Sequence, residues 1–480
     1  MKQASKGRSG AGRPPGDPAR RAAFDVLSAV SGRGAYANLL LATLLRERGL
    51  RGQDAALTTE LVYGTLRNRG SYDAVIGLCA DRGLDQMDPP VREILRLGVH
   101  QLLGMRIKPH AAVATAVDLA VEVAGRRPSG FVNAVLRRVT AHDLESWTQI
   151  VAPSREADLV GHLSVRYSHP RWIVAALADA LGEEIPGPGQ SGALPETEAA
   201  LAADRDRPVV TLAAVPGLAS SDELMAGGAT TARWSPYGAY LAHGDPGALA
   251  AVRQHRAGVQ DEASQLAVLA LIRAETAGAE PGGMADRAWL DLCAGPGGKA
   301  RLLAGLAAER EAVLLAVDAH YHRARLAASA VSGIPVAAAV TADGTAPAWR
   351  PGTFDRVLAD VPCTGLGSLR RRPDARWRRS PDDIAALAGL QRALLASAIG
   401  SARPGGVIAY VTCSPHIAET RDVVADVLAD HTDVQVLDAP ALLPEVPGLR
   451  CPEPYGRFAQ FWPHRHGTDA IFVALLRRDE

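Results

Sequence analysis

A chain of 480 residues is too long for one ordinary hydrophobic core, and this length predicts two to four domains. Its 52 basic and 52 acidic residues balance to a formal charge of zero, so no single sign of charge marks the whole chain. Five widely spaced cysteines without a CxxC pair argue against a disulfide framework and a zinc finger, and favour a reducing cytoplasm.

The first segment, residues 1–18, mixes Lys and Arg with Gly, Ser and Pro, and we expect a disordered basic tail. It lacks the apolar stretch of a signal peptide, and no run of eighteen apolar residues occurs in the chain. We therefore expect a cytoplasmic protein that does not enter a membrane.

Residues 19–143 are expected to form an all-helical domain, because apolar residues such as Phe24, Leu27 and Val30 recur at helical spacing. Residues 1–150 hold 21 Lys and Arg against 14 Asp and Glu, a formal charge of +7 that leaves −7 for the remainder. Such a surplus suits contact with phosphates, and a merely solvated surface is the alternative.

Residues 144–255 are expected to form a linker and a small α+β module. An Ala-rich helix is predicted over residues 172–181, and the Gly, Pro and Ser of residues 187–195 predict a flexible connection. The run PVVTLAAV, residues 208–215, predicts a strand.

In the last part, residues 256–480, predicted helices alternate with short apolar runs. These runs are AWLDLCA, AVLLAVDA, IPVAAAVTAD, FDRVLADVP, GVIAYVTCS, VQVLDAP and DAIFVALLRR. The alternation predicts an α/β, Rossmann-like domain with a parallel sheet covered on both faces. In such sheets ligands gather at the carboxyl ends of the strands, so functional residues are expected there.

The first run ends in DLCAGPGGK, residues 291–299, where glycines allow a tight turn and close approach of a ligand to the N–H groups of the following helix. Asp318 ends the second run, a position from which a carboxylate can accept hydrogen bonds from both ribose hydroxyls. Asp343 ends the third run, where a side chain could bond the exocyclic amine of adenine. A nicotinamide dinucleotide would satisfy the first two features equally well.

Two cysteine motifs favour a different chemistry. The fourth run ends in ADVPCTGLG, with Asp360 and Cys363, and the fifth ends in YVTCSP, with Cys413. Two thiols at neighbouring strand ends are not explained by packing alone. The other three cysteines are interpreted as small buried apolar residues: Cys79, Cys293 and Cys451.

A thiolate and a carboxyl group beside a methyl donor are the parts needed to methylate carbon 5 of cytosine. That carbon is too weak a nucleophile to take a methyl group unaided. A thiolate that adds to carbon 6 makes carbon 5 enamine-like, and a carboxyl group near N3 stabilises the charge of the adduct. A base must then remove the proton from carbon 5 before the thiolate can leave.

Taken together, DLCAGPGGK, AVDAH, VTADG, DVPCTGLGSLRRRPDARW and TCSP, with VQDEASQLA upstream and WPHRHGTDAIFVALL downstream, resemble the Sun/Fmu family of RNA cytosine-5 methyltransferases. This resemblance spans about residues 259–478. The segments ELVYGTLRNRGSYDAVI, KPHAAVATAVDLAVEVA and FVNAVLRRV resemble the NusB family of helical RNA-binding domains. Together they imply a NusB-like domain, a small module and a class I methyltransferase domain that acts on small-subunit (16S) ribosomal RNA.

The resemblance also implies residue roles. Cys413 corresponds to the covalent nucleophile, Cys363 to the residue that assists release of the enzyme, and Asp360 to a group that faces both cofactor and base. The cofactor implied is S-adenosyl-L-methionine. Its site corresponds to Cys293, Ala294, Gly295, Pro296, Gly297, Gly298, Lys299, Asp318, Asp343 and Asp360.

Arginines around an aromatic residue, just beyond the fourth strand, suit single-stranded RNA, with a solvated loop as the alternative. These are Arg370, Arg371, Arg372 and Arg376, with Trp377. In the helical domain the corresponding candidates are Arg67, Arg69, Arg137 and Arg138. His464 and His466 lack partners at metal-ligand spacing, so we expect no metal.

The chain departs from the family pattern in two places. It has DVPC where the family usually has alanine before the proline, and an Arg and Asn pair expected in the middle module is replaced near VTLAAV, residues 210–215. The second departure puts RNA contacts of that module in doubt. We expect a monomer, and transfer RNA, DNA or a non-catalytic role in RNA binding and assembly remain alternatives.

Overall fold

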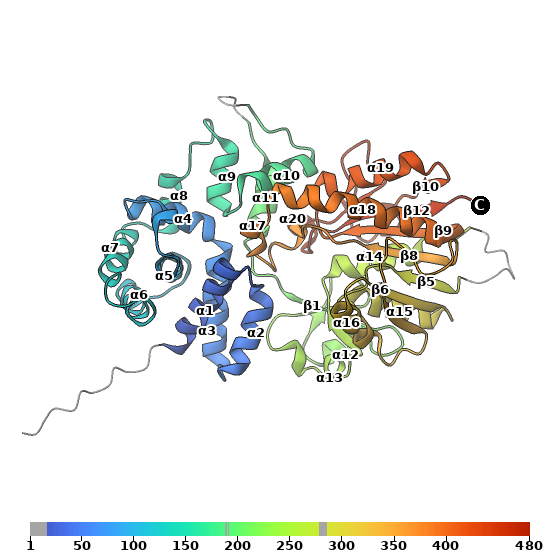
Figure 1. The fold of residues 1–480 in the computed structure, drawn as a ribbon. Helices are drawn as coiled ribbons and strands as arrows, with labels where there is room; N and C mark the ends of the chain where they lie inside the picture. Colours follow the sequence, from blue (N-terminus) through green and yellow to red (C-terminus); the bar gives the residue numbers. More distant parts are fainter. Residues whose placement is uncertain (1–16, 188–189, 191, 278–285) are drawn as a thin grey trace, which may run out of the picture. The chain divides into compact units, whose positions relative to one another are not determined.

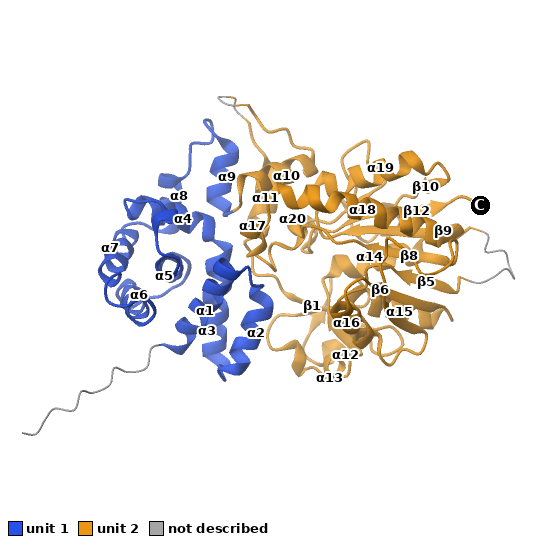
Figure 2. Cartoon of the chain, in the orientation of Figure 1, with its two compact units in different colours: residues 1–168 blue, residues 169–480 orange. Residues whose placement is uncertain are grey.

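A computed structural model describes residues 17–187, 190, 192–277 and 286–480 of the chain. It divides into two compact units, Met1–Ser168 and His169–Glu480 (Figure 2). Most of the expected basic tail lies outside the described residues. Its last two positions belong to the first helix instead, because Asp17 caps this helix by accepting the N–H of Arg20 and Pro18 occupies its first turn.

Unit 1 is helical throughout its described residues, as expected. Its α-helices are α1 (Pro18–Arg33), α2 (Ala37–Glu47), α3 (Gly52–Arg67), α4 (Arg69–Cys79), α5 (Pro89–Val99), α6 (Pro109–Ala124), α7 (Ser129–Val139), α8 (Leu144–Val151) and α9 (Leu159–Tyr167). The apolar faces of α1 to α8 form one buried cluster that includes Leu27, Leu61, Ile94 and Leu136. This cluster is the core of the unit.

The helical unit extends further than the expected boundary at residue 143. Helices α8 and α9 pack against α4. The Ser71 hydroxyl donates to the carbonyl of Val165 at 2.6 Å, and Ser168 accepts the N–H of Gly70 at 2.8 Å. Tertiary contacts of this kind cannot be read from the periodicity of α8 and α9, so the division falls after Ser168.

Unit 2 begins with α10 (Arg171–Leu181) and α11 (Pro195–Ala203) and continues into a small antiparallel sheet. The strand order of this sheet is β2 (Thr230–Thr231), β3 (Gly238–Leu241), β1 (Val210–Ala214) and β4 (Ala257–Val259). It forms the α+β module expected from the sequence, together with α12 (Ser221–Ala226) and α13 (Ala250–Arg253). The module ends where α14 (Glu262–Arg273) begins.

The larger sheet carries the strand ends singled out in the sequence. Its strand order is β10 (Val434–Val436), β12 (Phe472–Arg478), β9 (Ala402–Thr412), β8 (Phe354–Asp360), β5 (Ala288–Asp291), β6 (Val313–Asp318) and β7 (Ala337–Thr341), and β11 (Ala459–Gln460) pairs with β12. Strands β5 to β9 are parallel. The expectation of a wholly parallel sheet is wrong for β12 and β10, since both pair antiparallel.

Alternate residues of the central strands enter two different cores. In β9, Val407, Ala409 and Val411 face one core, whereas Ile408 and Tyr410 face the other. Such alternation within an unbroken apolar run is typical of a strand buried on both faces. Figure 1 shows the helices that cover these faces: α14, α15 (Gly298–Glu309) and α16 (Tyr321–Val331) on one side, α18 (Pro381–Ser401) and α19 (Arg421–Asp430) on the other.

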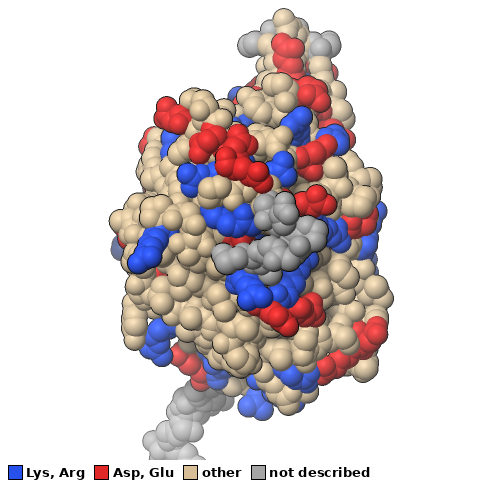
Figure 3. All heavy atoms as spheres, turned by 90° about the vertical axis from the view of Figure 1, so that its right-hand side faces the viewer, with Lys and Arg blue, Asp and Glu red and all other residues tan. Residues whose placement is uncertain are grey.

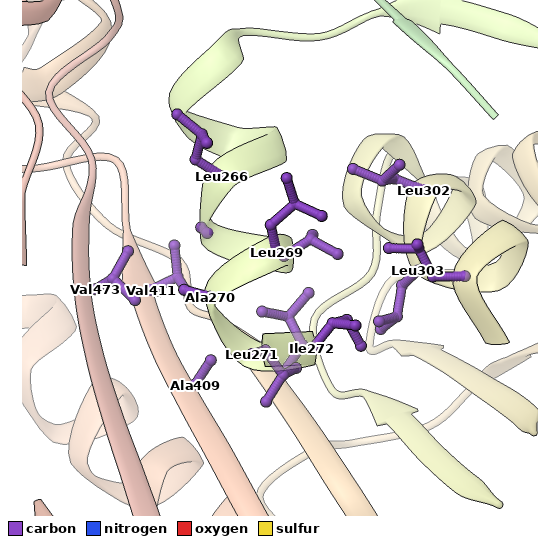
Figure 4. Close-up of a cluster of buried hydrophobic side chains, with 14 of the residues drawn as sticks. Leu266, Leu269, Ala270, Leu271, Ile272, Leu302, Leu303, Ala409, Val411 and Val473 are labelled. Carbon is purple, nitrogen blue, oxygen red and sulfur yellow. The ribbon is translucent and has the colours of Figure 1, made fainter. Parts of the chain in front are cut away.

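Helix α14 joins the small sheet to the catalytic sheet. Its apolar side chains, among them Leu266, Ala270 and Leu271, lie between β9 and β12 on one side and α15 on the other (Figure 4). Its first residue, Glu262, accepts hydrogen bonds from the backbone of Ser235 at 2.7 Å and from the Tyr240 hydroxyl. The module is therefore held against the larger sheet.

Among the described helices, α18 alone is long and apolar enough to cross a membrane by length and composition. It packs instead on β8, β9 and α19, and Leu394, Leu395 and Ile399 enter the core on that side of the sheet. Packing within the domain accounts for its apolar character.

Candidate active site

The glycine turn between β5 and α15 is built by backbone contacts to the neighbouring strands. The N–H of Leu292 donates to Leu358 on β8 at 2.8 Å, and that of Ala294 donates to Val317 on β6 at 2.7 Å. Helix α15 then starts at Gly298, and no side chain caps it. Its first N–H groups consequently have no partner within the helix and point toward the ends of the strands.

The three glycines of this turn differ in whether the structure could accept a side chain at their positions. Gly297 has a φ of 107°, and a Cβ there would lie 2.5 Å from the Cβ of Ala330. A Cβ on Gly295 would lie 2.4 Å from Oδ2 of Asp318. Gly298 differs, because a Cβ there would meet nothing closer than Nε2 of Gln260 at 3.9 Å. Packing explains the first two glycines, whereas a Cβ at Gly298 would make only an ordinary van der Waals contact with Gln260.

Asp318 lies at the end of β6, as expected, and contacts the glycine turn. Its Oδ2 accepts the N–H of Gly295 at 3.1 Å and lies 3.2 Å from Nε of Arg323, while Oδ1 accepts the N–H of His320 at 2.9 Å. Arg323 also donates to the carbonyl of Gly295. Arg323 was not predicted as a site residue, and its place in the first turn of α16 is the signal that could have indicated it.

Asp291, Lys299 and Asp360 form a cluster of ionisable groups next to the turn, in which Asp291 is fully buried and Asp360 is half-buried. Nζ of Lys299 lies 2.8 Å from Oδ2 of Asp360. Burial raises the pKa of Asp291 to about 8, and repulsion by Asp360 adds to this shift while Lys299 opposes it. Neither carboxyl oxygen of Asp291 has a side-chain partner among the described residues. Burial lowers the pKa of Lys299, but attraction to Asp360 outweighs it, so the net shift is upward.

The two predicted catalytic cysteines lie side by side at the ends of β8 and β9. Their Sγ atoms are 3.2 Å apart, and both thiols are free and half-buried. A hydrogen bond from Cys363 lowers the pKa of Cys413, and the nearby positive charges of Lys299 and Arg372 act in the same direction against burial and Asp360. The same bond, burial and the Glu419 carboxylate raise the pKa of Cys363. Cys413 is thus the more readily ionised thiol, a distinction the sequence alone did not provide.

This asymmetry predicts how Cys413 reacts with a small alkylating reagent as pH changes. Because only the thiolate reacts and the pKa is lowered, alkylation should reach half of its maximal rate below the pH of an ordinary cysteine, about 8.5. Lys299→Met removes a positive charge and should move the half-rise to higher pH. Mass spectrometry of the Cys413 peptide measures this, with the exposed Lys108→Met as control. A half-rise at the ordinary value, unmoved by Lys299→Met, would contradict the assignment.

A buried glutamate that the sequence analysis missed fixes the loop carrying Cys363. Glu419 has no exposed surface, and its carboxylate accepts hydrogen bonds from the N–H of Thr364, at 2.8 Å, and from the Thr364 hydroxyl. Nε2 of Gln391 donates to Glu419 at 3.1 Å and to the carbonyl of Pro362 at 2.9 Å. The spacing of Glu419 after Cys413 is the only signal the sequence offers, because its partners lie far away in the chain.

The arginines after β8 that were expected to contact RNA differ in how far they are buried. Arg370 is only 8% exposed and Arg376 is fully buried, so the structure does not support direct RNA contact by either. Arg370 and Arg371 pair instead with Asp261 and Asp469, at 2.7 to 3.0 Å. These pairs join the start of α14 to the loop after β8 and the segment before β12.

Arg372 and Trp377 are half-buried, and the positive charge of Arg372 acts on Cys413. In unit 1, Arg67 is 8% exposed, whereas Arg137 and Arg138 are exposed and Arg138 pairs with Asp81. The face of the molecule in Figure 3 carries basic and acidic side chains in small alternating groups. Charge on that face therefore gives no preference for phosphates.

Asp343 lies two residues beyond the end of β7 and is exposed. It accepts the backbone N–H of Thr345 at 2.9 Å and the Thr345 hydroxyl at 2.7 Å, which lowers its pKa. Among the described residues, no group of three His, Cys, Asp or Glu side chains could hold a metal ion. His464 contacts Glu196, and His466 contacts the carbonyl of Pro447.

Two protein families match this chain. Residues 283–477 match the family described as 16S rRNA methyltransferase RsmB/F, and residues 17–141 match the NusB family. These matches confirm the expected order of a NusB-like helical domain followed by an α/β methyltransferase domain. They also cover the glycine turn and both cysteine motifs in a single model.

Whole-chain relatives are similarly arranged. A protein of Mycobacterium tuberculosis named "Putative methyltransferase Rv1407" is 52% identical over 97% of this chain and 98% of its own length. A Pseudomonas putida protein named "Ribosomal RNA small subunit methyltransferase B" is 31% identical over 95% of this chain and 98% of its own. The crystal structure of PH0851 shares the fold, with a TM-score of 0.75 at 21% identity, and covers 97% of this chain and 100% of that one.

Proposed function

Because this chain belongs to the RsmB/F family of methyltransferases, which act on RNA with S-adenosylmethionine, we propose that it methylates carbon 5 of a cytosine in 16S ribosomal RNA through a covalent bond from Cys413. The observation that carries the proposal is the Cys363 and Cys413 pair, with Sγ atoms 3.2 Å apart, beside the Lys299 and Asp360 pair. Few reactions need two thiols and a carboxylate at one edge of such a sheet.

The residues present fit S-adenosylmethionine. Residues 293–299, with Asp318, Asp343 and Asp360, would hold it. The absence of a close neighbour at Gly298 and the uncapped start of α15 support this assignment, as does Asp318 fixed beside the turn. When bound, S-adenosylmethionine supplies an electrophilic methyl group. The five free thiols suit a reducing cytoplasm.

Cys413 begins the reaction on the base. Its thiolate bonds to carbon 6 of cytosine, and the electrons of the double bond between carbons 5 and 6 make carbon 5 nucleophilic toward the methyl group. Asp360 and Lys299 offer an acceptor and a donor to the polar edge of the base, where they stabilise charge as the adduct forms. The hydrogen bond from Cys363 lowers the pKa of Cys413 and so favours the thiolate that attacks.

Release requires carbon 5 to lose its proton. The electrons of that bond re-form the double bond between carbons 5 and 6, and the bond from carbon 6 to Sγ of Cys413 breaks, so that Cys413 leaves as a thiolate. We assign that proton to the thiolate form of Cys363, whose Sγ lies 3.2 Å from that of Cys413, so Cys363 gains the proton as Cys413 departs. The target cytosine must be unstacked to enter such a site.

Transfer of labelled methyl from S-adenosylmethionine to unmodified 16S ribosomal RNA tests the proposal. We expect label in 5-methylcytosine after digestion of the RNA to nucleosides. Transfer RNA and DNA of matched length are the competitors, because 16S RNA as substrate rests on relatives about 30% identical. Label in transfer RNA alone would overturn the substrate, and cofactor binding without transfer to any nucleic acid would favour a non-catalytic RNA-binding role.

A further inference from the structure

Gln260 has a buried side-chain amide with no partner in the part of the chain that the structure describes. It lies between β4 and α14 and is 7% exposed. Neither Oε1 nor Nε2 forms a hydrogen bond with the described residues. Leaving a buried amide unsatisfied costs about 1 to 3 kcal/mol, so such a group in a native protein calls for an explanation.

The backbone of Gln260 is held firmly while its side chain is not. Its N–H donates to the carbonyl of Thr211 on β1 at 3.0 Å, and its carbonyl accepts Nε2 of Gln265 at 3.1 Å. The next residue, Asp261, is anchored by Arg370 and Arg371. The Gln265 side chain also donates to the carbonyl of Leu212 and accepts from the Ser235 hydroxyl. The amide of Gln265 is therefore hydrogen-bonded, whereas that of Gln260 has no partner among the described residues.

The Gln260 amide is directed at the start of α15. Its Nε2 lies 3.9 Å from the position that a Cβ added to Gly298 would occupy. This is the glycine without a packing reason, and it begins a helix of 12 residues whose first N–H groups lack a side-chain cap. An amide without a partner among the described residues therefore lies next to the uncapped start of α15.

We propose that Gln260 binds the amino-acid end of S-adenosylmethionine at the N-terminus of α15. This end carries a carboxylate and an ammonium group. The carboxylate suits the N–H groups of α15 and the Nε2 donor, and the ammonium suits the Oε1 acceptor. The inference rests on the proposed function and adds that the small module contributes to the cofactor site, because β4 and β1 fix Gln260.

Two ligands that differ only at this end provide the test. S-adenosylhomocysteine has the amino-acid group, whereas 5′-methylthioadenosine lacks it and keeps the adenosine and the sulfur. With the full-length protein in a calorimeter, Gln260→Met should weaken binding of S-adenosylhomocysteine by about 10- to 100-fold, since hydrogen bonds to charged groups are lost. Binding of 5′-methylthioadenosine should be unchanged.

Gln260→Glu is the second variant, because its carboxylate would repel that of the ligand and should again weaken S-adenosylhomocysteine selectively. Gln435→Met, at an exposed position on β10, is the matched control and should change neither affinity. Equal weakening of both ligands, or of neither, would overturn the role of Gln260. If the wild-type protein bound neither ligand, the proposed function itself would fail, so the two failures are distinguishable.

Discussion

Replacing Cys413 with alanine should abolish methyl transfer, by about 1000-fold or more, while Cys363→Ala should trap the enzyme on its RNA. The first loss follows because Cys413 forms the bond to carbon 6 in the proposed reaction, and removal of a nucleophile typically has effects of this size. The second follows because Cys413, once bonded, depends on Cys363 for release. A denaturing gel with labelled RNA separates the covalent adduct from free protein.

Cys79→Ala is the matched control, since it removes a buried thiol from the helical unit and should leave transfer unchanged. The double variant, with both Cys363 and Cys413 replaced, should form no adduct. If Cys413→Ala instead accumulated adduct and Cys363→Ala abolished it, the two roles would be reversed. The lowered pKa of Cys413 and the raised pKa of Cys363 argue against that reversal.

Glu419→Ala should produce the second largest effect, although Glu419 is a positioning residue that touches neither base nor cofactor. The substitution leaves the N–H and hydroxyl of Thr364 and the amide of Gln391 without their buried acceptor. Loss of such a group costs about 2 to 4 kcal/mol of folding free energy. Because Thr364 follows Cys363 directly, we also expect kcat to fall about 10- to 100-fold with little change in KM.

Three measurements distinguish positioning from simple loss of stability. Thermal unfolding gives the stability change, and kinetics well below the melting temperature give kcat and KM. The rate of alkylation of Cys363 against pH gives its ionisation, which should shift to lower pH because the Glu419 carboxylate raises its pKa. Glu309→Ala, an exposed position on α15, should alter none of these. Unchanged kcat and an unchanged Cys363 profile in Glu419→Ala would refute a positioning role.

Local patterns in the sequence were enough to predict the main elements of the catalytic domain. Apolar runs that end in Asp, Cys or Gly correspond to β5, β6, β8 and β9, and the glycine turn leads into α15 as expected. They succeed because strand burial and strand-end chemistry depend on neighbours along the chain. The orientation of a strand in the sheet cannot be predicted from its own residues. The runs of β10 and β12 look like the others, and only pairing with β9 decides that β12 is antiparallel.

The arginines after β8 show the same limit for side chains. Their spacing favoured RNA contact, but Asp261 and Asp469 lie about 100 residues away in either direction and engage Arg370 and Arg371 inside the domain. No local pattern contains those partners. Glu419 and Gln260 were missed for a related reason. Glu419 accepts hydrogen bonds from donors that are distant in the chain. Gln260 is notable because its side chain has no partner among the described residues.

The sequence by itself was enough to predict the fold class, the order of the domains, the glycine turn and the positions of Cys363 and Cys413 at strand ends. Each of these depends on residues that are close together in the chain. Only the tertiary structure decided which of the two thiols ionises more readily and which polar groups remain unpaired beside Gly298. Those properties depend on charge and burial summed over segments that meet in space, and a side chain's pKa and its hydrogen bonds are set by that sum.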